Sequence, residues 1–198
     1  KTLNPRRWDF DHLAELARLA GFQYAVFTTK HHNGFCLWDT KTTDFNIMNT
    51  PYGKDLVRQY AEAFRKQGLR VGFYFSPEDF RFLRSQGLTI TRTPEKPYPK
   101  EVMDAYRALL KAQMTELMQN FGKVEILINN AGIESRLKPG ETFFGTLFDK
   151  LDEETYLSFF KVHDYGHYLM NLAVIPSMRE HHFGRIVNVT SVTGIHGN

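Results

Sequence analysis

Two adjacent histidines, His31 and His32, are the residues whose type and spacing point most directly to ligand binding. They follow an apolar segment, residues 22–29, that is predicted to form a β-strand, and α/β proteins bind ligands at the carboxyl ends of their strands. Each imidazole offers a donor and an acceptor, which suits a ring of sugar hydroxyl groups, and Trp38 could stack on the apolar face of a sugar. The alternative is a loop whose histidines hydrogen-bond to the loop itself.

Other polar residues are predicted where later strands end. Asn129 and Asn130 follow one apolar segment, and Ser191 follows another. Because the carboxyl ends of parallel strands meet at one edge of a sheet, the topology predicts a shared polar cleft, which comprises His31, Tyr74, Asn130 and Ser191. For Ser191 the alternative is a strand end that caps its own turn.

Apolar periodicity predicts the helices and strands that position these residues. Helices show apolar residues every three to four positions, whereas buried parallel strands are nearly continuous apolar runs. The predicted helices span residues 9–20, 54–67, 102–121 and 152–181, the last interrupted by Pro176, and the predicted strands span residues 22–29, 69–75, 124–128 and 185–189.

The first and third helices are each predicted to bury one apolar face. Asp9 or Asp11 can cap the first helix, and Gly21 can end it. Its predicted buried face comprises Phe10, Leu13, Leu16, Ala17 and Ala20. The third helix has a broad face made of Val102, Ala105, Tyr106, Leu109, Leu110, Gln113, Met114, Leu117, Met118 and Phe121.

Alternation of helix and strand predicts an α/β fold. Four helix–strand units would form a parallel sheet with right-handed crossovers, either layered like a Rossmann fold or curved like a half-barrel. Such crossovers place the helices on one face and leave the other bare, and a monomer does not tolerate a bare apolar face of several hundred Å². We therefore expect the first helix to fold under the sheet or two chains to pair as a homodimer.

Composition excludes several classes of partner. The chain has 198 residues, 42% of them apolar and 24% charged, with a net charge of +3, as expected for one globular domain. Its basic residues are dispersed, so no nucleic-acid partner is expected. No apolar run approaches the roughly 20 residues of a membrane span. Without a recognisable signal peptide, and with Cys36 as its lone cysteine, the protein is expected to be cytoplasmic.

Residues 4–122 resemble the α-L-fucosidases, a family of (β/α) barrel hydrolases. The resemblance lies in Lys30-His31-His32-Asn33-Gly34-Phe35-Cys36-Leu37-Trp38, in Asp44-Phe45-Asn46, in Met48-Asn49-Thr50, in Lys54-Asp55-Leu56-Val57 and in Gly72-Phe73-Tyr74-Phe75-Ser76-Pro77. It implies that His31, His32 and Trp38 contact a sugar. Asn33 stands where Asp is more usual in the family.

The fucosidase resemblance lacks a matching carboxylate. Hydrolysis with retention needs two carboxyl groups about 5 Å apart, one of them a nucleophile. The family's nucleophilic Asp follows a later strand, and the corresponding strand here leads into Asn129 and Asn130. Glu78 and Asp79 match no catalytic motif, so they are expected to be solvated loop charges or helix starts.

Residues 120–198 resemble the short-chain dehydrogenases/reductases, which are Rossmann-fold oxidoreductases that bind a nicotinamide dinucleotide. The resemblance lies in residues 121–133, which contain Asn129-Asn130-Ala131-Gly132, in Ile175-Pro176-Ser177-Met178 and in residues 184–194. It implies that the Asn-Asn-Ala-Gly turn lines a vestigial cofactor pocket and that Ser191 occupies the catalytic serine position. The glycine-rich turn and the Tyr-x-x-x-Lys pair of that family are missing.

Each motif therefore has its family's flanking sequence but an incomplete site. The sequence predicts an engineered or recombined chimeric scaffold that forms one domain, residues 1–198, with a seam at residues 120–124. No catalysis, cofactor or metal is expected. The alternatives are a weak fucose-like sugar-binding module, a residual glycoside hydrolase and an NAD(P)-dependent oxidoreductase.

Overall fold

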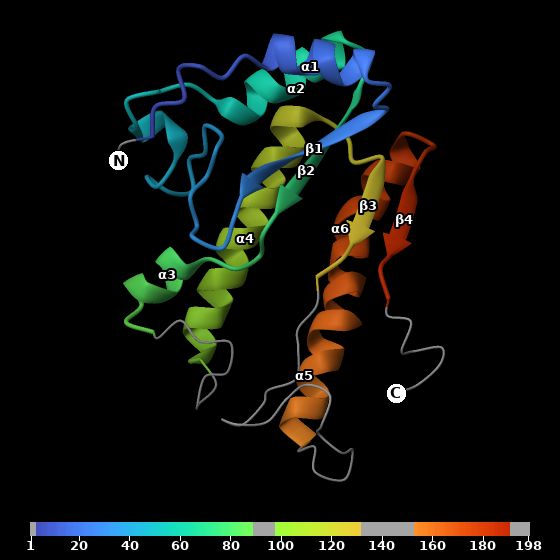
Figure 1. Ribbon diagram of the computed structural model, residues 1–198. Helices are drawn as coiled ribbons and strands as arrows, with labels where there is room; N and C mark the ends of the chain where they lie inside the picture. The colour runs from blue at the N-terminus through green and yellow to red at the C-terminus, as the bar shows by residue number, and fades with distance from the viewer. Residues whose placement is uncertain (1–2, 89–97, 132–152, 191–198) are drawn as a thin grey trace, which may run out of the picture. The chain divides into compact units, whose positions relative to one another are not determined.

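A computed structural model describes residues 3–88, 98–131 and 153–190, and Figure 1 shows their arrangement into helices and strands. The helices are α1 (Phe10–Leu19), α2 (Leu56–Lys66), α3 (Phe80–Ser85), α4 (Lys100–Phe121), α5 (Glu153–His163) and α6 (Tyr165–Glu180), with a short 3-10 helix η1 (Ile47–Asn49). The strands are β1 (Tyr24–Lys30), β2 (Arg70–Phe75), β3 (Ile126–Asn129) and β4 (Arg185–Asn188). The α/β class expected from the sequence is confirmed.

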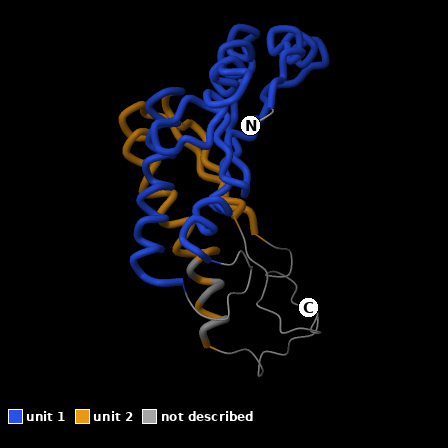
Figure 2. Tube along the Cα trace, turned by 90° about the vertical axis from the view of Figure 1, so that its left-hand side faces the viewer, with its two compact units in different colours: residues 1–121 blue, residues 122–198 orange. Residues whose placement is uncertain are grey.

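The chain forms two compact units, which Figure 2 shows in different colours. Unit 1 comprises residues 1–121 and unit 2 comprises residues 122–198. The boundary between them lies inside the segment 120–124, where the sequence places a helix end and the start of a strand. The single domain expected from the sequence stays a prediction.

Each unit contains a parallel pair of strands. In unit 1, β1 pairs with β2 from Tyr24 opposite Arg70 onward, and in unit 2, β3 pairs with β4 from Ile126 opposite Arg185 onward. The single four-stranded sheet expected from the sequence is not seen among the described residues, where the strands form two separate two-stranded sheets. The apolar pattern of a sequence identifies strands but not which strands pair, so it could not distinguish one four-stranded sheet from two two-stranded sheets.

Aspartates start three of the helices in unit 1. Each side chain accepts a hydrogen bond from the backbone amide three residues later, which satisfies a donor that has no partner within the helix. The pairs are Asp9 with His12, Asp55 with Arg58 and Asp79 with Phe82. Asp9 rather than Asp11 is therefore the cap of α1.

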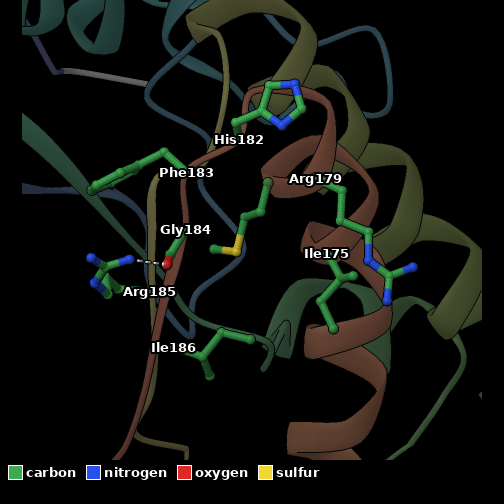
Figure 3. A pocket seen from close by; sticks show the side chains of 8 residues that line it. Ile175, Arg179, His182, Phe183, Gly184, Arg185 and Ile186 are labelled. Atoms are coloured by element: carbon green, nitrogen blue, oxygen red, sulfur yellow. Dashed lines mark hydrogen bonds between the residues drawn. The ribbon is translucent and has the colours of Figure 1, made fainter.

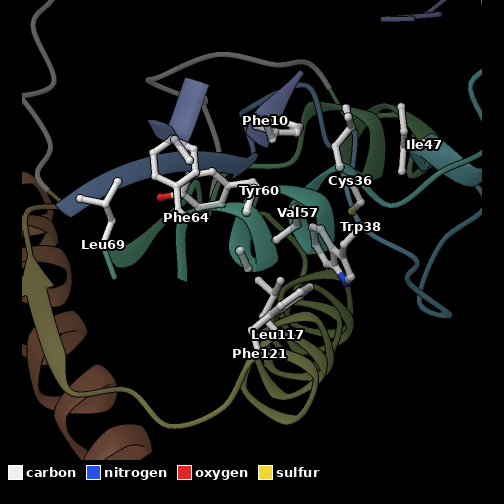
Figure 4. Packing of buried hydrophobic residues seen from close by; sticks show 14 residues of the cluster. Phe10, Cys36, Trp38, Ile47, Val57, Tyr60, Phe64, Leu69, Leu117 and Phe121 are labelled. Carbon is white, nitrogen blue, oxygen red and sulfur yellow. The ribbon is translucent and has the colours of Figure 1, made fainter. Parts of the chain in front are cut away.

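The core of unit 1 lies between its helices and one face of the β1–β2 sheet, as Figure 4 shows. Tyr60 of α2 is central, because its ring stacks on Phe27 of β1 at 5.0 Å and its hydroxyl donates to the Ala25 carbonyl at 2.6 Å. Phe121, the last residue of α4, packs edge-on against Phe73 of β2 at 5.3 Å. Residues from α1, α2, α4 and both strands thus share one apolar cluster.

The buried faces of α1 and α4 are narrower than expected. In α1, Phe10 and Ala14 are buried, whereas Leu13 and Leu16 are 47% and 48% exposed, so their expected burial is wrong. The ring of Phe10 packs among the aromatic residues of the core, and this contact sets the rotation of the helix. In α4 the buried residues are Gln113, Leu117 and Phe121.

The other face of the β1–β2 sheet is not covered within unit 1. Tyr24 is 63% exposed, Val26 is 56% exposed and Tyr74 is 41% exposed. This matches the bare face that one-sided crossovers imply, and α1 lies with the core rather than beneath that face. The homodimer expected to cover it stays a prediction.

In unit 2, α6 packs its buried Val174 and Met178 against Leu127 of β3. Sequence predicted one helix interrupted at Pro176, but Pro176 lies inside α6 and the break falls at Asp164, between α5 and α6. Asp164 and Gly166 both have low helix propensity, which favours a break there. No helix in the three described ranges combines the length and apolar character needed to cross a membrane.

Candidate functional site

An irregularity at the end of β1 determines where the two histidines emerge. The strand register shifts between Thr28 and Lys30. As a result, both Thr29 and Lys30 are buried, although successive residues of a regular strand point to opposite faces. The Thr29 hydroxyl donates to the Tyr74 carbonyl at 2.9 Å and ties this bulge to β2. His31 then follows as an exposed residue.

The rings of His31 and His32 lie together at the carboxyl end of β1. Their centroids are 4.2 Å apart, and the His31 ring is 5.9 Å from the ring of Tyr74 on β2. His31 and Tyr74 are exposed, and His32 is half-buried. The structure therefore brings three of the residues singled out in the sequence to one edge of the β1–β2 sheet.

His32 is held by residues that follow β2. Its Nδ1 is 2.5 Å from the Ser76 hydroxyl and 3.0 Å from a carboxylate oxygen of Glu78. Either the hydroxyl donates to Nδ1 or Nδ1–H donates to the carboxylate, and in both cases the protein engages Nδ1. Nε2 is then the ring nitrogen that a ligand can use. Sequence reasoning missed this role of Ser76 and Glu78, whose position after a strand end was the available signal.

A buried ion pair lies behind the histidines. Nζ of Lys30 is 3.5 Å from a carboxylate oxygen of Asp79, and the two side chains are 0% and 6% exposed. Lys30 also lies over the Phe75 ring at 4.6 Å. Burial lowers the pKa of Lys30, and the nearby Asp79 carboxylate partly opposes that shift. Of the two roles expected for Asp79, a solvated loop charge or a helix start, the structure shows the helix start, because its buried side chain caps α3.

Trp38 does not offer a ring face to a ligand in unit 1. Its side chain is completely buried in the core, and its Nε1 donates to Glu116 of α4 at 3.3 Å. Glu116 also accepts from the Thr40 hydroxyl and, at 2.9 Å, from the Lys41 amide. Stacking of Trp38 on a sugar is therefore corrected to a role in anchoring the loop that follows the histidines. Residue type alone could not separate these roles.

Cys36 is a structural thiol in this loop. It is fully buried, and desolvation raises its pKa to about 12, so the thiol stays protonated near neutral pH. Nε2 of Gln113 lies 3.7 Å from its sulfur. Within the described ranges no three His, Cys, Asp or Glu side chains are grouped so as to hold a metal ion.

The asparagines of unit 2 have separate roles. Asn129 is buried, and its Nδ2 donates to Asn171 at 3.0 Å and to Asn188 at 2.9 Å, which joins β3, α6 and β4. Asn130 and Ala131 are exposed. The remaining dehydrogenase-like candidates, Gly132 and Ser191, lie outside the described residues. The cofactor pocket and the shared cleft therefore stay predictions.

Unit 2 also has an open hollow of about 600 Å³ between the end of α6 and the start of β4. Three basic residues line it, but Figure 3 shows Arg179, His182 and Arg185 pointing in different directions. Arg185 lies over the Phe183 ring at 5.0 Å. Since these groups do not converge on one point, the hollow lacks the geometry of an anion site.

Comparison with known proteins identifies the relatives of the chain. The Alpha-L-fucosidase family model matches residues 1–173. Alpha-L-fucosidase 1 of Arabidopsis thaliana is 29% identical over 154 residues, which are 76% of this chain and 27% of that protein. The chain spans roughly a quarter of the length of the curated fucosidases that it matches.

A solved structure supports the same relationship. The crystal structure of a trapped covalent intermediate of a Bacteroides thetaiotaomicron α-L-fucosidase mutant, in complex with 2-fluoro-fucosyl fluoride, matches with a TM-score of 0.56 and 29% identity. The match covers 63% of this chain and 28% of that one. The likeness to dehydrogenases is partial: levodione reductase of Leifsonia aquatica is 29% identical over 160 residues, 80% of this chain and 56% of that protein.

These matches correct one prediction and leave another unconfirmed. The prediction that the protein is not an enzyme is wrong, because the family model and the relatives are those of a glycoside hydrolase family. A chimera is not confirmed, since the family match runs through the expected seam at residues 120–124. With a match over residues 1–173, the chain belongs to the α-L-fucosidase family.

Proposed function

We propose that unit 1 carries the fucose-binding part of an α-L-fucosidase-type glycoside hydrolase. The observation that carries this proposal is the pair of histidines at the carboxyl end of β1, with Nδ1 of His32 engaged from β2 by Ser76 and Glu78. Family membership supplies the substrate class, an α-L-fucoside. We further propose that unit 1 is a segment of the family's (β/α) barrel, because its helices cover one face of a parallel sheet.

The histidines have the chemistry to recognise sugar hydroxyl groups. His31 is exposed and can offer one donor and one acceptor, and His32 presents Nε2 because the protein engages its Nδ1. The phenol of Tyr74, close to His31, adds another hydroxyl at the same edge. A hydroxyl-rich ligand that satisfies these groups would be preferred over one that leaves them unpaired.

Cleavage of a fucoside requires carboxyl groups beyond these contacts. Retaining hydrolysis uses one carboxyl as a nucleophile and one as the acid and base, about 5 Å apart. Asp79 is buried against Lys30, and Glu78 is engaged with His32, so we assign both a positioning role. Asn129 and Asn130 cannot form a glycosyl ester, because an amide side chain is not a nucleophilic carboxylate. Binding and hydrolysis are therefore separate parts of the proposal.

A separate proposal concerns the origin of unit 2. We propose that it derives from a short-chain dehydrogenase-like segment joined near residues 120–124. The unit boundary after Phe121 and the dehydrogenase-like sequence Asn129-Asn130-Ala131-Gly132 that follows it support this join. Two separate unfolding transitions in calorimetry, one for each unit, would support the join. A single cooperative transition, with neither unit folding when the chain is cut at this boundary, would count against it.

Fucose binding is tested by thermal melts of the full chain with millimolar L-fucose, and D-fucose serves as the mirror-image control. L-fucose should raise the melting temperature, and D-fucose should not. His31→Ala should abolish the shift, whereas His12→Ala, a change at an exposed histidine of α1, should keep it. Equal shifts with both enantiomers, or none with either, would rule out a fucose site. Release of nitrophenol from an aryl α-L-fucoside tests hydrolysis separately.

A further inference from the structure

We propose that the buried pair of Lys30 and Asp79 is a positioning device that fixes the histidine loop, defined as residues 31–34, against the start of α3. The pair would thereby set where His31 and His32 present their rings. This inference rests on the proposed fucose site, because it gives the two buried charges a role in ligand recognition. Lys30 and Asp79 are positioning residues and do not touch the sugar.

The buried pair lies directly beside the histidine loop and the residues that hold it. Lys30 directly precedes His31, and Asp79 directly follows Glu78, which engages His32. Each buried charge is thus adjacent in sequence to a residue of the site, Lys30 at the end of β1 and Asp79 after β2. The two buried charges are 3.5 Å apart, with 0% and 6% of their side chains exposed. Any movement of one strand end relative to the other must therefore disturb both the pair and the site.

The Asp79 carboxylate makes three contacts at once. One oxygen accepts from Nζ of Lys30, and the other accepts from the Phe82 amide at 2.9 Å, which caps α3. The carboxylate also fills the space beside Gly34, where an added Cβ would be 2.2 Å from one of its oxygens. Gly34 has a φ of +81°, which glycine adopts readily. The loop thus passes over Asp79 as closely as a glycine permits.

Backbone hydrogen bonds complete the connection. The Phe80 amide, one residue after Asp79, donates to the His32 carbonyl at 2.7 Å. Within the loop, the Gly34 amide donates to the His31 carbonyl at 3.0 Å. The Ser76 amide donates to the Lys30 carbonyl at 3.0 Å. Both histidines are therefore held through their own backbones, and the ion pair lies within this frame.

Stability alone does not account for such a pair. Replacing a buried ion pair with apolar or neutral residues of similar volume is often neutral or stabilising, because both charges are desolvated. Removing only one partner is damaging, because it leaves the other charge buried and unpaired. A variant that removes both charges and keeps the volume can therefore retain the fold and lose only the positioning.

The test compares Lys30→Met, Asp79→Asn and the double variant in the full chain. Met keeps the apolar stem of Lys30, and Asn keeps the side-chain oxygen that accepts from Phe82. The control is Lys66→Met with Asp11→Asn, which removes an exposed ion pair between α2 and α1. The readouts are the melting temperature, the affinity for L-fucose by calorimetry, and the hydrogen-exchange rates of the Gly34 and Phe80 amides.

A positioning role predicts that the double variant melts close to the parent protein but exchanges both amides about tenfold faster or more. Its affinity for L-fucose should fall about tenfold or more, because a displacement near 1 Å can cost about a hundredfold in a preorganised site. The control should change neither property. Parent-like exchange and parent-like affinity in the double variant would overturn the inference.

Failure of the proposed function would be recognisable separately. A parent protein that does not bind L-fucose would remove the sugar site, while the amide exchange would still show whether the pair fixes the loop. Should the double variant not fold, Asp79→Glu gives the exchange readout, because it keeps both charges and only lengthens the carboxylate side chain by one methylene. Unchanged exchange at Phe80 in that variant would overturn the inference.

Discussion

The Glu78 carboxylate lies 3.0 Å from Nδ1 of His32, so a residue that follows β2 holds the ring of a residue that follows β1. The contact joins the two strand ends at the candidate sugar site. The two side chains are 38% and 52% exposed, so the contact contributes little to stability, and its main effect is to orient the His32 ring.

Glu78→Gln should therefore leave the melting temperature unchanged and weaken L-fucose binding, and calorimetry measures both. A melting temperature that falls with unchanged fucose affinity would contradict an orienting role.

Gly34 should not tolerate a side chain. In Gly34→Ala the new Cβ would lie 2.2 Å from Asp79 in addition to requiring a positive φ, so we expect a loss of about 3 kcal/mol or more in the free energy of unfolding. Gly68→Ala is the matched control, because Gly68 has a φ of +74° but no atom within 4 Å of an added Cβ. It should cost only about 1–2 kcal/mol. Equal losses in urea unfolding would show that the Asp79 contact is unimportant.

Tyr60→Phe should destabilise unit 1 through one hydrogen bond. The Tyr60 hydroxyl donates to the Ala25 carbonyl at 2.6 Å in the core, and its loss should cost about 1–2 kcal/mol. Tyr24→Phe is the control, since Tyr24 is 63% exposed and its hydroxyl removal should change little. Denaturant unfolding of both variants is followed by far-ultraviolet circular dichroism. A free energy of unfolding that Tyr60→Phe leaves unchanged would argue against the buried hydrogen bond.

Asn129 should matter to unit 2 more than its neighbour Asn130. Asn129→Ala removes the amide that donates to the side-chain oxygens of Asn171 and Asn188. We expect the free energy of unfolding to fall by about 1–3 kcal/mol, because both oxygens lose a hydrogen bond. Asn130 is exposed, so Asn130→Ala should be nearly neutral. Calorimetric melts compare them, and equal melting temperatures would contradict the structural role of Asn129.

Cys36 should make the protein sensitive to alkaline pH. Burial raises the pKa of its thiol from 9.0 to about 12, so the folded chain keeps a proton that the unfolded chain releases above pH 9. This contribution to stability is complete below pH 9 and is lost as the pH rises towards 12. Within that window it falls by up to about 1.4 kcal/mol per pH unit.

Cys36→Ala should flatten the alkaline part of this dependence. Urea unfolding at about pH 8 and about pH 10 gives the comparison, because the variant lacks the thiol and keeps the other titrating groups. The native thiol should also resist a thiol reagent near neutral pH and react once the chain is unfolded. Rapid modification of the folded protein would show that Cys36 is not buried.

The sequence was informative where local chemistry decides the structure. Glycines and aspartates at segment ends anticipated the helix boundaries, such as the Asp9 cap of α1, and apolar runs located all the described strands. The position of the histidines after β1 followed from the same reasoning. The partners of a strand and the burial of a side chain depend on distant residues, which is why the two sheets and the burial of Trp38 were not foreseen.

The supporting residues were hidden for a related reason. Lys30 is a charged residue in a strand, and only the register shift after Thr28 shows that its side chain turns inwards. Asp79 has the same chemistry as the exposed Glu78 beside it, and the difference arises from the loop that covers Asp79. A single sequence reveals neither the register shift nor this covering loop.

The most direct test of the account is the binding of L-fucose to the full chain, measured by calorimetry together with His31→Ala and His32→Ala. We expect saturable binding of L-fucose, weaker or no binding of D-fucose, and loss of binding in both variants while His12→Ala keeps it. Absence of L-fucose binding by a folded parent protein, or binding that both histidine variants retain, would contradict the account.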